Sequence, residues 1–513
     1  MIITRHFLDV EGRRVHYRKA GEGPPLLMIH QSPRSSAEYE GLMREWSGRF
    51  TCIAPDTPGF GQSDPLPGAP EIDDFADAVL AFMDAVGLGR CAAYGFHSGG
   101  IILMTALRRR PERFETLAIG GYAVWTEEER ALFADRYLPA FRPSAYGEHL
   151  AWLWSRVLEQ SWFFPWFDLR DEARLPGAHD DPERVDAVVR ELLDSGDAYR
   201  AGYGAVLRAP RDIPDTNAAV PPVLITAYDG DPLQAHLARL GPLPRGWEAR
   251  PVATPAEHRR ESFEFLAARV EAPCPALAEC GSEGFVHVEA AGFSGLVHWR
   301  GDGAAGRAIL HGPGESLELI ETDALAVDLP GHGLSDDFAS NDPEHWAEVA
   351  AAALANASCT DISLVAGQGL SALFAPSVAR RLGAEAEGVA AHIPCEEDRE
   401  AWLEQLFDPA PDRFGSHLAA AWQIARAGTF FWPWFRAGAA SAIPFDPGAA
   451  SPERLALRHR ALMRGRGAAA LTRALLTADR ARLIEAAPIR AWRMADWAMR
   501  RTDLWKPIIE GET

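Results

Sequence analysis

The chain has 513 residues, of which 47% are hydrophobic and 24% charged, and its formal net charge is −21. This length is too great for one ordinary hydrophobic core and predicts about two to four domains, while the composition excludes a mostly disordered chain. The negative charge, without any basic cluster, argues against nucleic-acid binding. No apolar run reaches the roughly 18 residues of a membrane span, and Met1–Val10 lacks the apolar stretch of a secretory signal.

Short apolar runs typical of buried strands alternate with helical patterns along the first half of the chain. The predicted strands are 25–30, 51–55, 91–95, 116–120, 223–228 and 248–253. The predicted helices are 73–86, 99–109 and 255–270. A Trp-rich, helix-like insertion at about 126–215 interrupts this alternation. The pattern predicts an α/β fold, with a mostly parallel sheet flanked by helices and a helical cap.

The second half repeats the landmarks of the first. Asp56–Asp64 reads DTPGFGQSD, and Asp328–Asp336, 272 positions later, reads DLPGHGLSD. At the same offset, Gly95–Gly100 (GFHSGG) corresponds to Gly367–Ala372 (GQGLSA). Further pairs in the same order are Val15–Arg18 with Val297–Arg300, and Phe163–Phe167 with Phe431–Phe435. These landmarks predict a tandem duplication.

The duplication predicts two domains of unequal completeness. The predicted parts are a first domain at 1–272 with its cap at about 126–215, a linker at 273–282, and a second domain at 283–513 with its cap at about 395–480. Only a short tail follows the strand expected around 489–494, so the second copy is predicted to lack the last strand and helix. We expect the second half to pack on the first as a pseudo-dimer, and a further homo-oligomer stays open.

These motifs together resemble the α/β-hydrolase superfamily over nearly the whole chain. The matching pieces are the turn at His30-Gln31, the loop Asp56–Asp64, the elbow Gly95–Gly100, the inserted cap, and an acid after the next strand at Asp229 or Asp231. The resemblance implies two tandem α/β-hydrolase-like domains. It is far less specific for the reaction, because one fold hosts many chemistries.

The elbow departs from the family pattern G-x-Nu-x-G, in which the central residue is the nucleophile. Aligning Gly95 and Gly99 with the two glycines places His97 at that position. A shift by one residue would make Ser98 the nucleophile, but the first small flanking residue would then be lost. In the second half the elbow position is Gly369, which has no side chain. We therefore expect catalysis only in the first half.

A histidine at the elbow can act as a general base or as a nucleophile. The resemblance implies an oxyanion hole built from the backbone N–H groups of Gln31 and Ser98. Asp231 is the candidate orienting acid, although an aspartate before Pro232 could instead cap the following helix. His258 is the candidate base after the last strand, and a surface histidine in a first helical turn is the other interpretation.

The cap is dense in aromatic residues, which predicts a largely apolar lid with a few polar contacts. The candidate substrate-binding residues are His30, Arg34, His149, Trp154, Trp162 and Trp166. Cap core or a contact between the halves is the alternative interpretation for most of the aromatic residues, and a structural role in the loop is the alternative for His30.

Taken together, these features predict a cofactor-free hydrolase or lyase that acts on a small, partly apolar carbonyl compound. A non-enzymatic pseudo-hydrolase that binds a small ligand or a protein partner is the alternative, because both halves lack the usual nucleophile. The six cysteines form neither a CxxC pair nor a metal-ligand spacing with histidine, so no metal is expected and a reducing cytoplasm is favoured. Neither nucleic acid nor a membrane is an expected partner.

Overall fold

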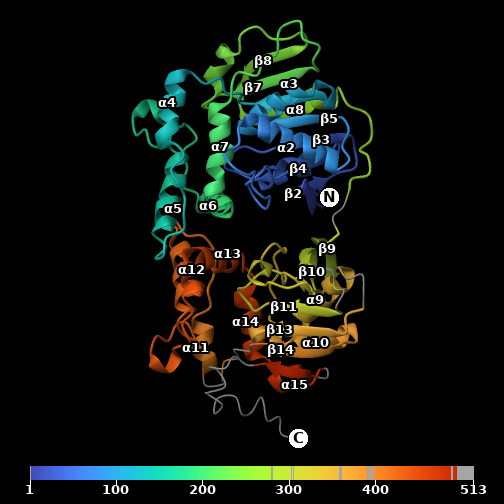
Figure 1. The fold of residues 1–513 in the computed structure, drawn as a ribbon, viewed down its shortest axis with the longest axis vertical. Coiled ribbons are helices and arrows are strands. Elements are labelled where there is room, and N and C mark those ends of the chain that lie inside the picture. The colour runs from blue at the N-terminus through green and yellow to red at the C-terminus, as the bar shows by residue number, and fades with distance from the viewer. Residues whose placement is uncertain are drawn as a thin grey trace. The chain divides into compact units, whose positions relative to one another are not determined.

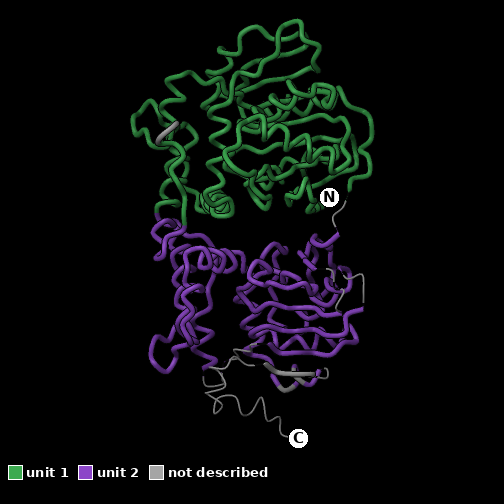
Figure 2. Tube along the Cα trace, viewed as in Figure 1, with its two compact units in different colours: residues 1–142, 152–280 green, residues 143–151, 281–513 purple. Residues whose placement is uncertain are grey.

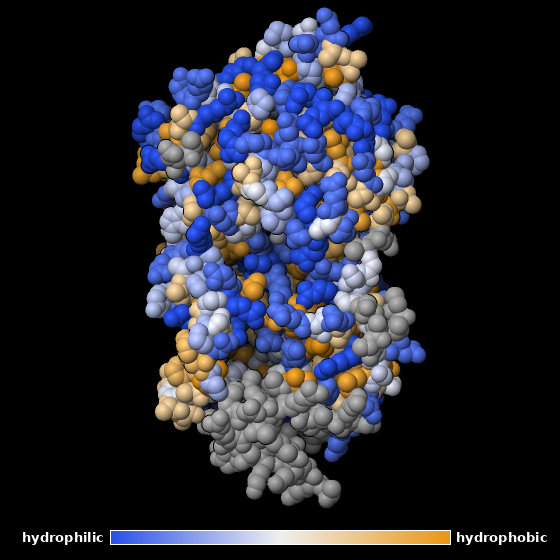
Figure 3. Space-filling model, viewed as in Figure 1, coloured by the Kyte–Doolittle hydropathy of each residue, from blue (hydrophilic) through white to orange (hydrophobic). Residues whose placement is uncertain are grey.

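The chain divides into two compact units (Figure 2). Unit 1 contains Met1–Arg142 and Trp152–Cys280, and unit 2 contains Pro143–Ala151 and Gly281–Thr513. The computed structural model describes residues 2–278, 281–301, 303, 306–357, 361–389, 394, 398–486 and 489–493. Within these residues no helix is both long and apolar enough to cross a membrane. The face drawn in Figure 3 is mostly hydrophilic, with apolar residues in small groups.

Unit 1 is built on an eight-stranded sheet with the order β1-β2-β4-β3-β5-β6-β7-β8. Its strands are β1 (Thr4–Val10), β2 (Arg13–Ala20), β3 (Pro25–Ile29), β4 (Thr51–Pro55), β5 (Cys91–Phe96), β6 (Phe114–Gly120), β7 (Val223–Tyr228) and β8 (Trp247–Val252). Strands β3 to β8 pair in parallel, and β1 and β2 add an antiparallel edge. The sheet confirms the predicted mostly parallel α/β architecture.

Helices cover both faces of this sheet, which explains why β3 and β4 are apolar and buried along their whole length. The helices are α1 (Glu40–Trp46), α2 (Ile72–Ala85), α3 (Ser98–Arg109) and α8 (Pro255–Ala267). Side chains of α2 and α3 form one core with the sheet. Side chains of α1 and α8, including Trp46 and Leu266, form a second core on the other face.

Four helices between β6 and β7 form the cap of unit 1, drawn beside the sheet in Figure 1. They are α4 (Glu127–Arg136), α5 (Glu148–Gln160), α6 (Pro182–Ser195) and α7 (Tyr199–Arg208). Thr126 caps α4, since its hydroxyl accepts from the Glu129 N–H while Glu129 accepts from the Thr126 N–H. Asp181 caps α6, since its carboxylate accepts from the Glu183 and Arg184 N–H groups, and Pro182 lies in the first turn.

Unit 2 contains a seven-stranded sheet within its described residues, in the order β9-β10-β12-β11-β13-β14-β15. The strands are β9 (Glu283–Ala290), β10 (Phe293–Arg300), β11 (Arg307–Leu310), β12 (Leu325–Val327), β13 (Leu364–Gln368), β14 (Glu385–Val389) and β15 (Ile489–Arg493). The helices are α9 (Pro343–Ala357), α10 (Ala375–Leu382), α11 (Arg399–Glu404), α12 (Ser416–Ala427), α13 (Pro452–Met463), α14 (Ala468–Thr477) and α15 (Arg480–Ile484). The predicted truncation concerns residues after 493, which lie outside the described residues, as do parts of the predicted linker.

A short segment from the middle of the first-half cap, Pro143–Ala151, belongs to unit 2. The carbonyl of Ala145 accepts hydrogen bonds from Arg426 at 3.0 Å and from the Trp422 indole at 3.4 Å. The His149 ring packs edge-on against Trp422, 4.8 Å between centroids. This assignment differs from the prediction that residues 126–215 form a cap within the first domain, because the sequence repeat carries no information about which core a loop joins.

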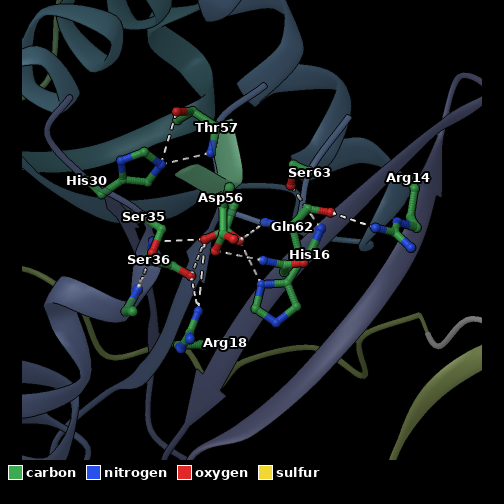
Figure 4. A network of polar contacts seen from close by, with 12 residues as sticks. Arg14, His16, Arg18, His30, Ser35, Ser36, Asp56, Thr57, Gln62 and Ser63 are labelled. Atoms are coloured by element: carbon green, nitrogen blue, oxygen red, sulfur yellow. Dashed lines mark hydrogen bonds and ion pairs between the residues drawn. The ribbon is translucent and has the colours of Figure 1, made fainter. Parts of the chain in front are cut away.

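The DxPGxGxSD loop is held by a buried carboxylate at its first position (Figure 4). Asp56 accepts hydrogen bonds from the His16 ring at 2.8 Å and from the Ser36 and Gln62 N–H groups at 2.8 and 2.9 Å. Burial alone would raise the pKa of Asp56, but His16 beside it and its hydrogen bond hold that pKa below its usual range. The carboxylate therefore fixes the loop against β2 and η1 (Ser36–Tyr39).

Unit 2 contains the same arrangement. Asp328 accepts from the His298 ring at 2.7 Å and from the Leu317 and Leu334 N–H groups at 2.8 and 2.9 Å. In both units, the N–H of the strand histidine donates to the serine of the loop, at 2.9 Å to Ser63 and at 3.0 Å to Ser335. The sequence motif therefore has the same local structure at both places.

Candidate active site

His97 lies at the turn between β5 and α3, with φ +47° and ψ −112°. Residues other than glycine rarely adopt such a backbone conformation, which costs about 1–3 kcal/mol and is found mostly at functional sites. The turn is tight because its glycines leave no room for a side chain. A Cβ on Gly99 would lie 1.9 Å from the carbonyl oxygen of Ile29, and one on Gly95 would lie 2.7 Å from the Gly100 nitrogen.

The His97 imidazole is paired with Asp231, which lies just after β7. Its Nε2 is 3.1 and 3.2 Å from the two carboxylate oxygens. The carboxylate is fully buried and also accepts the Leu233 N–H at 2.8 Å. Burial alone would raise the pKa of Asp231, but the adjacent His97 and these hydrogen bonds lower it. A charged carboxylate at this place holds Nε2 in its protonated form.

The other ring nitrogen of His97, Nδ1, is then the basic atom. Among the residues that the structure describes, none forms a hydrogen bond with it. His97 is 22% exposed and lines a cavity under the cap. The pair therefore holds an oriented imidazole in the lining of that cavity, which is the arrangement that a general base requires.

Two glycines at the end of β6 make room for this pair, and the sequence analysis did not identify them. A Cβ on Gly121 would lie 2.4 Å from Cδ2 of His97 and 2.8 Å from Oδ2 of Asp231. A Cβ on Gly120 would lie 2.3 Å from the Phe96 ring. The Gly-Gly pair at the end of the predicted strand 116–120 is the available signal, because only glycine permits such close approach.

His258 is neither the base of the site nor a surface histidine, which corrects both interpretations of the sequence. It is 2% exposed, and its ring lies between Tyr94 and Thr226, at 2.9 Å from the tyrosine hydroxyl and 2.6 Å from the threonine hydroxyl. Burial lowers its pKa to about 4. Both ring nitrogens are engaged away from His97, so His258 is a neutral core residue between α8 and the sheet.

The loop after β3 does not provide the predicted oxyanion donor. The Gln31 N–H donates to the Glu38 carboxylate at 2.7 Å, and the Gln31 side chain donates to the same carboxylate at 3.0 Å. The next amide, Ser32 N–H, donates to the Ser98 hydroxyl at 2.6 Å. The expectation for Gln31 is therefore wrong for this structure, because the sequence could not show that Glu38 folds back onto the loop.

Two more loop residues have structural partners instead of facing a ligand. Arg34 forms an ion pair with Glu191 of the cap helix α6, and Glu191 also accepts from the N–H and hydroxyl of Ser35 at 3.0 and 2.6 Å. His30 is 1% exposed and accepts the Thr57 N–H at 2.9 Å. Arg34 thus joins the cap to the loop, and His30 joins the loop to the end of β4.

The cavity beside His97 has a volume of about 40 Å³ and mostly apolar walls. Its lining residues are Ser32, His97, Ser98, Ile101, Ala123, Trp125, Tyr137, Phe164, Tyr203, Val206, Leu207, Pro232 and Leu233. The hydroxyls of Tyr137 and Tyr203 are 3.1 Å apart and are the polar groups that the cap contributes to this lining. Burial raises the pKa of both hydroxyls, so both stay protonated donors.

The aromatic residues predicted to bind substrate occupy other places. Trp154 is buried within the cap, while the indoles of Trp162 and Trp166 donate to the His179 and Tyr137 carbonyls at 2.8 and 3.2 Å. None of the three is among the cavity's lining residues, nor is His149, which packs in unit 2. The aromatic character of the cap could be predicted from the sequence, but the direction of each ring could not, because it depends on how the helices pack.

Glu38 gives the loop a pH-dependent stability. Burial raises its pKa to about 7, although Arg34 and the hydrogen bonds from Gln31 act in the opposite direction. Between the ordinary glutamate pKa of about 4.3 and 7, the folded chain binds a proton that the unfolded chain releases, so stability falls as the pH rises through this window. Glu38→Gln is therefore expected to flatten the slope of Tm against pH from 5 to 8. Glu45→Gln, at an exposed glutamate of α1, should leave the slope unchanged, and parallel curves for all three proteins would contradict the assignment.

Within the described part of the chain, no group of three or more His, Cys, Asp or Glu side chains could hold a metal ion. The site consists instead of one imidazole, one carboxylate, a serine hydroxyl and two tyrosine hydroxyls around an apolar space. Such a site can transfer protons and hold a small ligand by hydrogen bonds.

Comparison with known proteins places the chain in a family. The family model of the α/β hydrolase fold matches residues 24–189. The haloalkane dehalogenase of Sphingobium indicum is 32% identical over 225 residues, which cover 41% of this chain and 68% of that protein. Together with the sheet and the elbow, this similarity shows that the chain belongs to the α/β hydrolase fold family.

Two other relatives are shorter matches. Haloalkane dehalogenase 2 of Mycobacterium tuberculosis is 32% identical over 141 residues, 27% of this chain and 49% of that protein. The cis-3-alkyl-4-alkyloxetan-2-one decarboxylase of Shewanella oneidensis is 32% identical over 119 residues, 22% of this chain and 37% of that protein. The chain thus spans about half the length of the first of these relatives, and the relatives include both dehalogenases and a decarboxylase.

Proposed function

We propose that unit 1 is a cofactor-free hydrolase or lyase that acts on a small, partly apolar carbonyl compound, with His97 as its general base. The observation that carries this proposal is the His97–Asp231 pair, in which Nε2 of the ring lies 3.1 and 3.2 Å from the two oxygens of a buried carboxylate while His97 lines the cavity. Strain at the His97 backbone supports it, because a strained residue is retained where the surrounding structure and function require it.

In the hydrolytic form, Nδ1 of His97 takes a proton from a water molecule as the water oxygen attacks the substrate carbonyl carbon. The carbonyl electron pair moves to the oxygen, and Asp231 stabilises the imidazolium that has formed. When the carbonyl re-forms, the bond to the leaving group breaks and Nδ1–H returns its proton to that group. One water is consumed, one acid and one alcohol are produced, and His97 ends in its starting state.

The cavity restricts the substrate in size and polarity. A volume of about 40 Å³ corresponds to a few water molecules at roughly 10–15 Å³ each, so the cavity as formed accepts a compound of few heavy atoms. Its lining residues are mostly apolar, and the polar ones are Ser32, His97, Ser98, Tyr137 and Tyr203. We infer a substrate with a small alkyl part and one or two oxygen atoms.

We further propose that unit 2 is a duplicated copy of unit 1 that serves as a scaffold. The strand order of its seven described strands repeats that of β1 to β7, and the Asp328 loop repeats the hydrogen bonds of the Asp56 loop. Its elbow residue Gly369 has φ +56°, close to the φ of His97, but has no side chain. Gly369 therefore has no side chain that could act as a base at the elbow of unit 2.

Replacing the acid of the pair tests the proposal. The wild-type protein would be screened for acid release from methyl formate, methyl acetate and β-propiolactone, which are among the smallest esters. Asp231→Asn should lower turnover of any accepted probe about a hundredfold or more, because the amide no longer fixes the protonated Nε2. Asp229→Asn is the matched control, since that exposed carboxylate binds only the Gln234 side chain, at 2.8 Å, among the described residues.

Equal loss in both aspartate variants would contradict the proposal, and so would full activity in Asp231→Asn. Saturable binding of a probe without any turnover would instead support the alternative function, a ligand-binding pseudo-hydrolase. The hydrogen bonds that already occupy the loop amides of Gln31 and Ser32 are the observation that favours this alternative.

A further inference from the structure

Ser98 is one of the residues that line the cavity beside His97. Ser98 begins α3 directly after His97, is 3% exposed and lines the cavity, as does Ser32. Its oxygen accepts the Ser32 N–H at 2.6 Å. The Ser98 hydroxyl thus accepts the hydrogen bond that the Ser32 N–H of the loop after β3 could otherwise donate to a ligand.

The hydrogen-bond capacity of this hydroxyl is only partly used. A serine hydroxyl has one proton to donate besides its acceptor positions. Within the part of the chain that the structure describes, no group accepts the Ser98 proton, and the one partner of its oxygen is the Ser32 amide. A buried donor without an acceptor costs free energy unless a ligand or water supplies one.

We propose that Ser98 is a catalytic residue that donates its hydroxyl proton in a hydrogen bond to the substrate's carbonyl oxygen. The Ser32 N–H then acts through the hydroxyl, because a hydroxyl that accepts a hydrogen bond becomes a stronger donor. The proton stays on Ser98 throughout, and the developing negative charge on the substrate oxygen strengthens the hydrogen bond. This inference rests on the proposed function and adds a donor to the base His97.

The same geometry argues against Ser98 as a nucleophile. Activation of a serine requires a base within hydrogen-bond reach of its hydroxyl. In the described residues the hydroxyl is bonded to an amide donor instead, and His97 bonds to Asp231. The chemistry that this hydroxyl can recognise is an oxygen acceptor, which makes carbonyl compounds and carboxylates the fitting ligand class.

Acetate binding tests the donor separately from turnover, because acetate carries the oxygen charge without a reaction. Dissociation constants would be measured by calorimetry for the wild type, Ser98→Ala and Ser98→Thr, each also in the His97→Gln background. Ser98→Ala should weaken acetate binding at least tenfold in both backgrounds, and Ser98→Thr should restore it to within about threefold. Thermal unfolding of each variant would show that the fold is kept.

Tighter acetate binding by Ser98→Ala would overturn the proposal, because the hydroxyl would then be a competitor that blocks the Ser32 amide. Unchanged binding would overturn it as well and leave the hydroxyl with a purely structural role. Absence of acetate binding by the wild type would also count against it. Full turnover by His97→Gln would refute His97 as the base and so the proposed function. It would not refute the role of Ser98, because acetate binding by the Ser98 variants is compared within each background.

Discussion

Replacing His97 with glutamine is expected to lower turnover at least a hundredfold on any probe that the wild-type protein accepts. Glutamine keeps a polar group beside Asp231 but has no atom that takes up a proton near neutral pH. General-base catalysis contributes about 10²–10⁴-fold in enzymes, which sets the size of the expected loss. Steady-state rates measured with substrate above KM would isolate this effect from binding.

The chain itself provides the control substitution for this experiment. Gly369 occupies the corresponding turn of unit 2 with φ +56°, and His97 has φ +47°. His97→Gly should therefore relieve backbone strain and raise the free energy of unfolding by about 1 kcal/mol, while its turnover falls as far as that of His97→Gln. A less stable His97→Gly protein would show that contacts of the imidazole outweigh the strain. Retained turnover in both variants would exclude His97 as the base.

The backbone features of the site could be predicted from the sequence because each depends on a local motif. Gly95 and Gly99 have the spacing of the elbow motif, and the loop that begins at Asp56 contains a hydrogen bond of its own, from the Gln62 N–H to Asp56. Asp231 could be proposed because the resemblance to the α/β-hydrolase superfamily implies an acid after this strand. These inferences need only local motifs and their order along the chain.

The partners of the other candidates could not be predicted, because they come from distant segments. Glu38 reaches Gln31 only after η1 turns back on the loop, and Glu191 reaches Arg34 across 157 positions of sequence. The sequence allows His258 to be either the base or a surface histidine in a first helical turn, yet that turn packs against β5 and β7. Which face of a helix is buried is set by the sheet beneath it, and a single histidine carries too little periodicity to show this.

Gly121→Ala is expected to abolish turnover as completely as loss of His97. Gly121 has φ +59°, and an added Cβ would lie 2.6 Å from Nε2 of His97 and 2.8 Å from Oδ2 of Asp231. Real Cβ atoms do not approach other atoms so closely, so the two side chains must separate and their hydrogen bonds must break. We expect a loss of stability as well, because Asp231 is then a buried carboxylate without its hydrogen-bond donor His97.

Gly196→Ala is the control that separates the effect of this steric clash from the effect of backbone strain at a positive φ. Gly196 has φ +53°, close to that of Gly121, but nothing lies within 4 Å of an added Cβ. Urea unfolding should therefore show a larger loss for Gly121→Ala than for Gly196→Ala, and Gly196→Ala should keep full turnover. In the His97→Gly background the cost of Gly121→Ala should shrink, because the imidazole is no longer in the way. Equal costs in both backgrounds would mean that Gly121 supports the fold and not the His97–Asp231 pair.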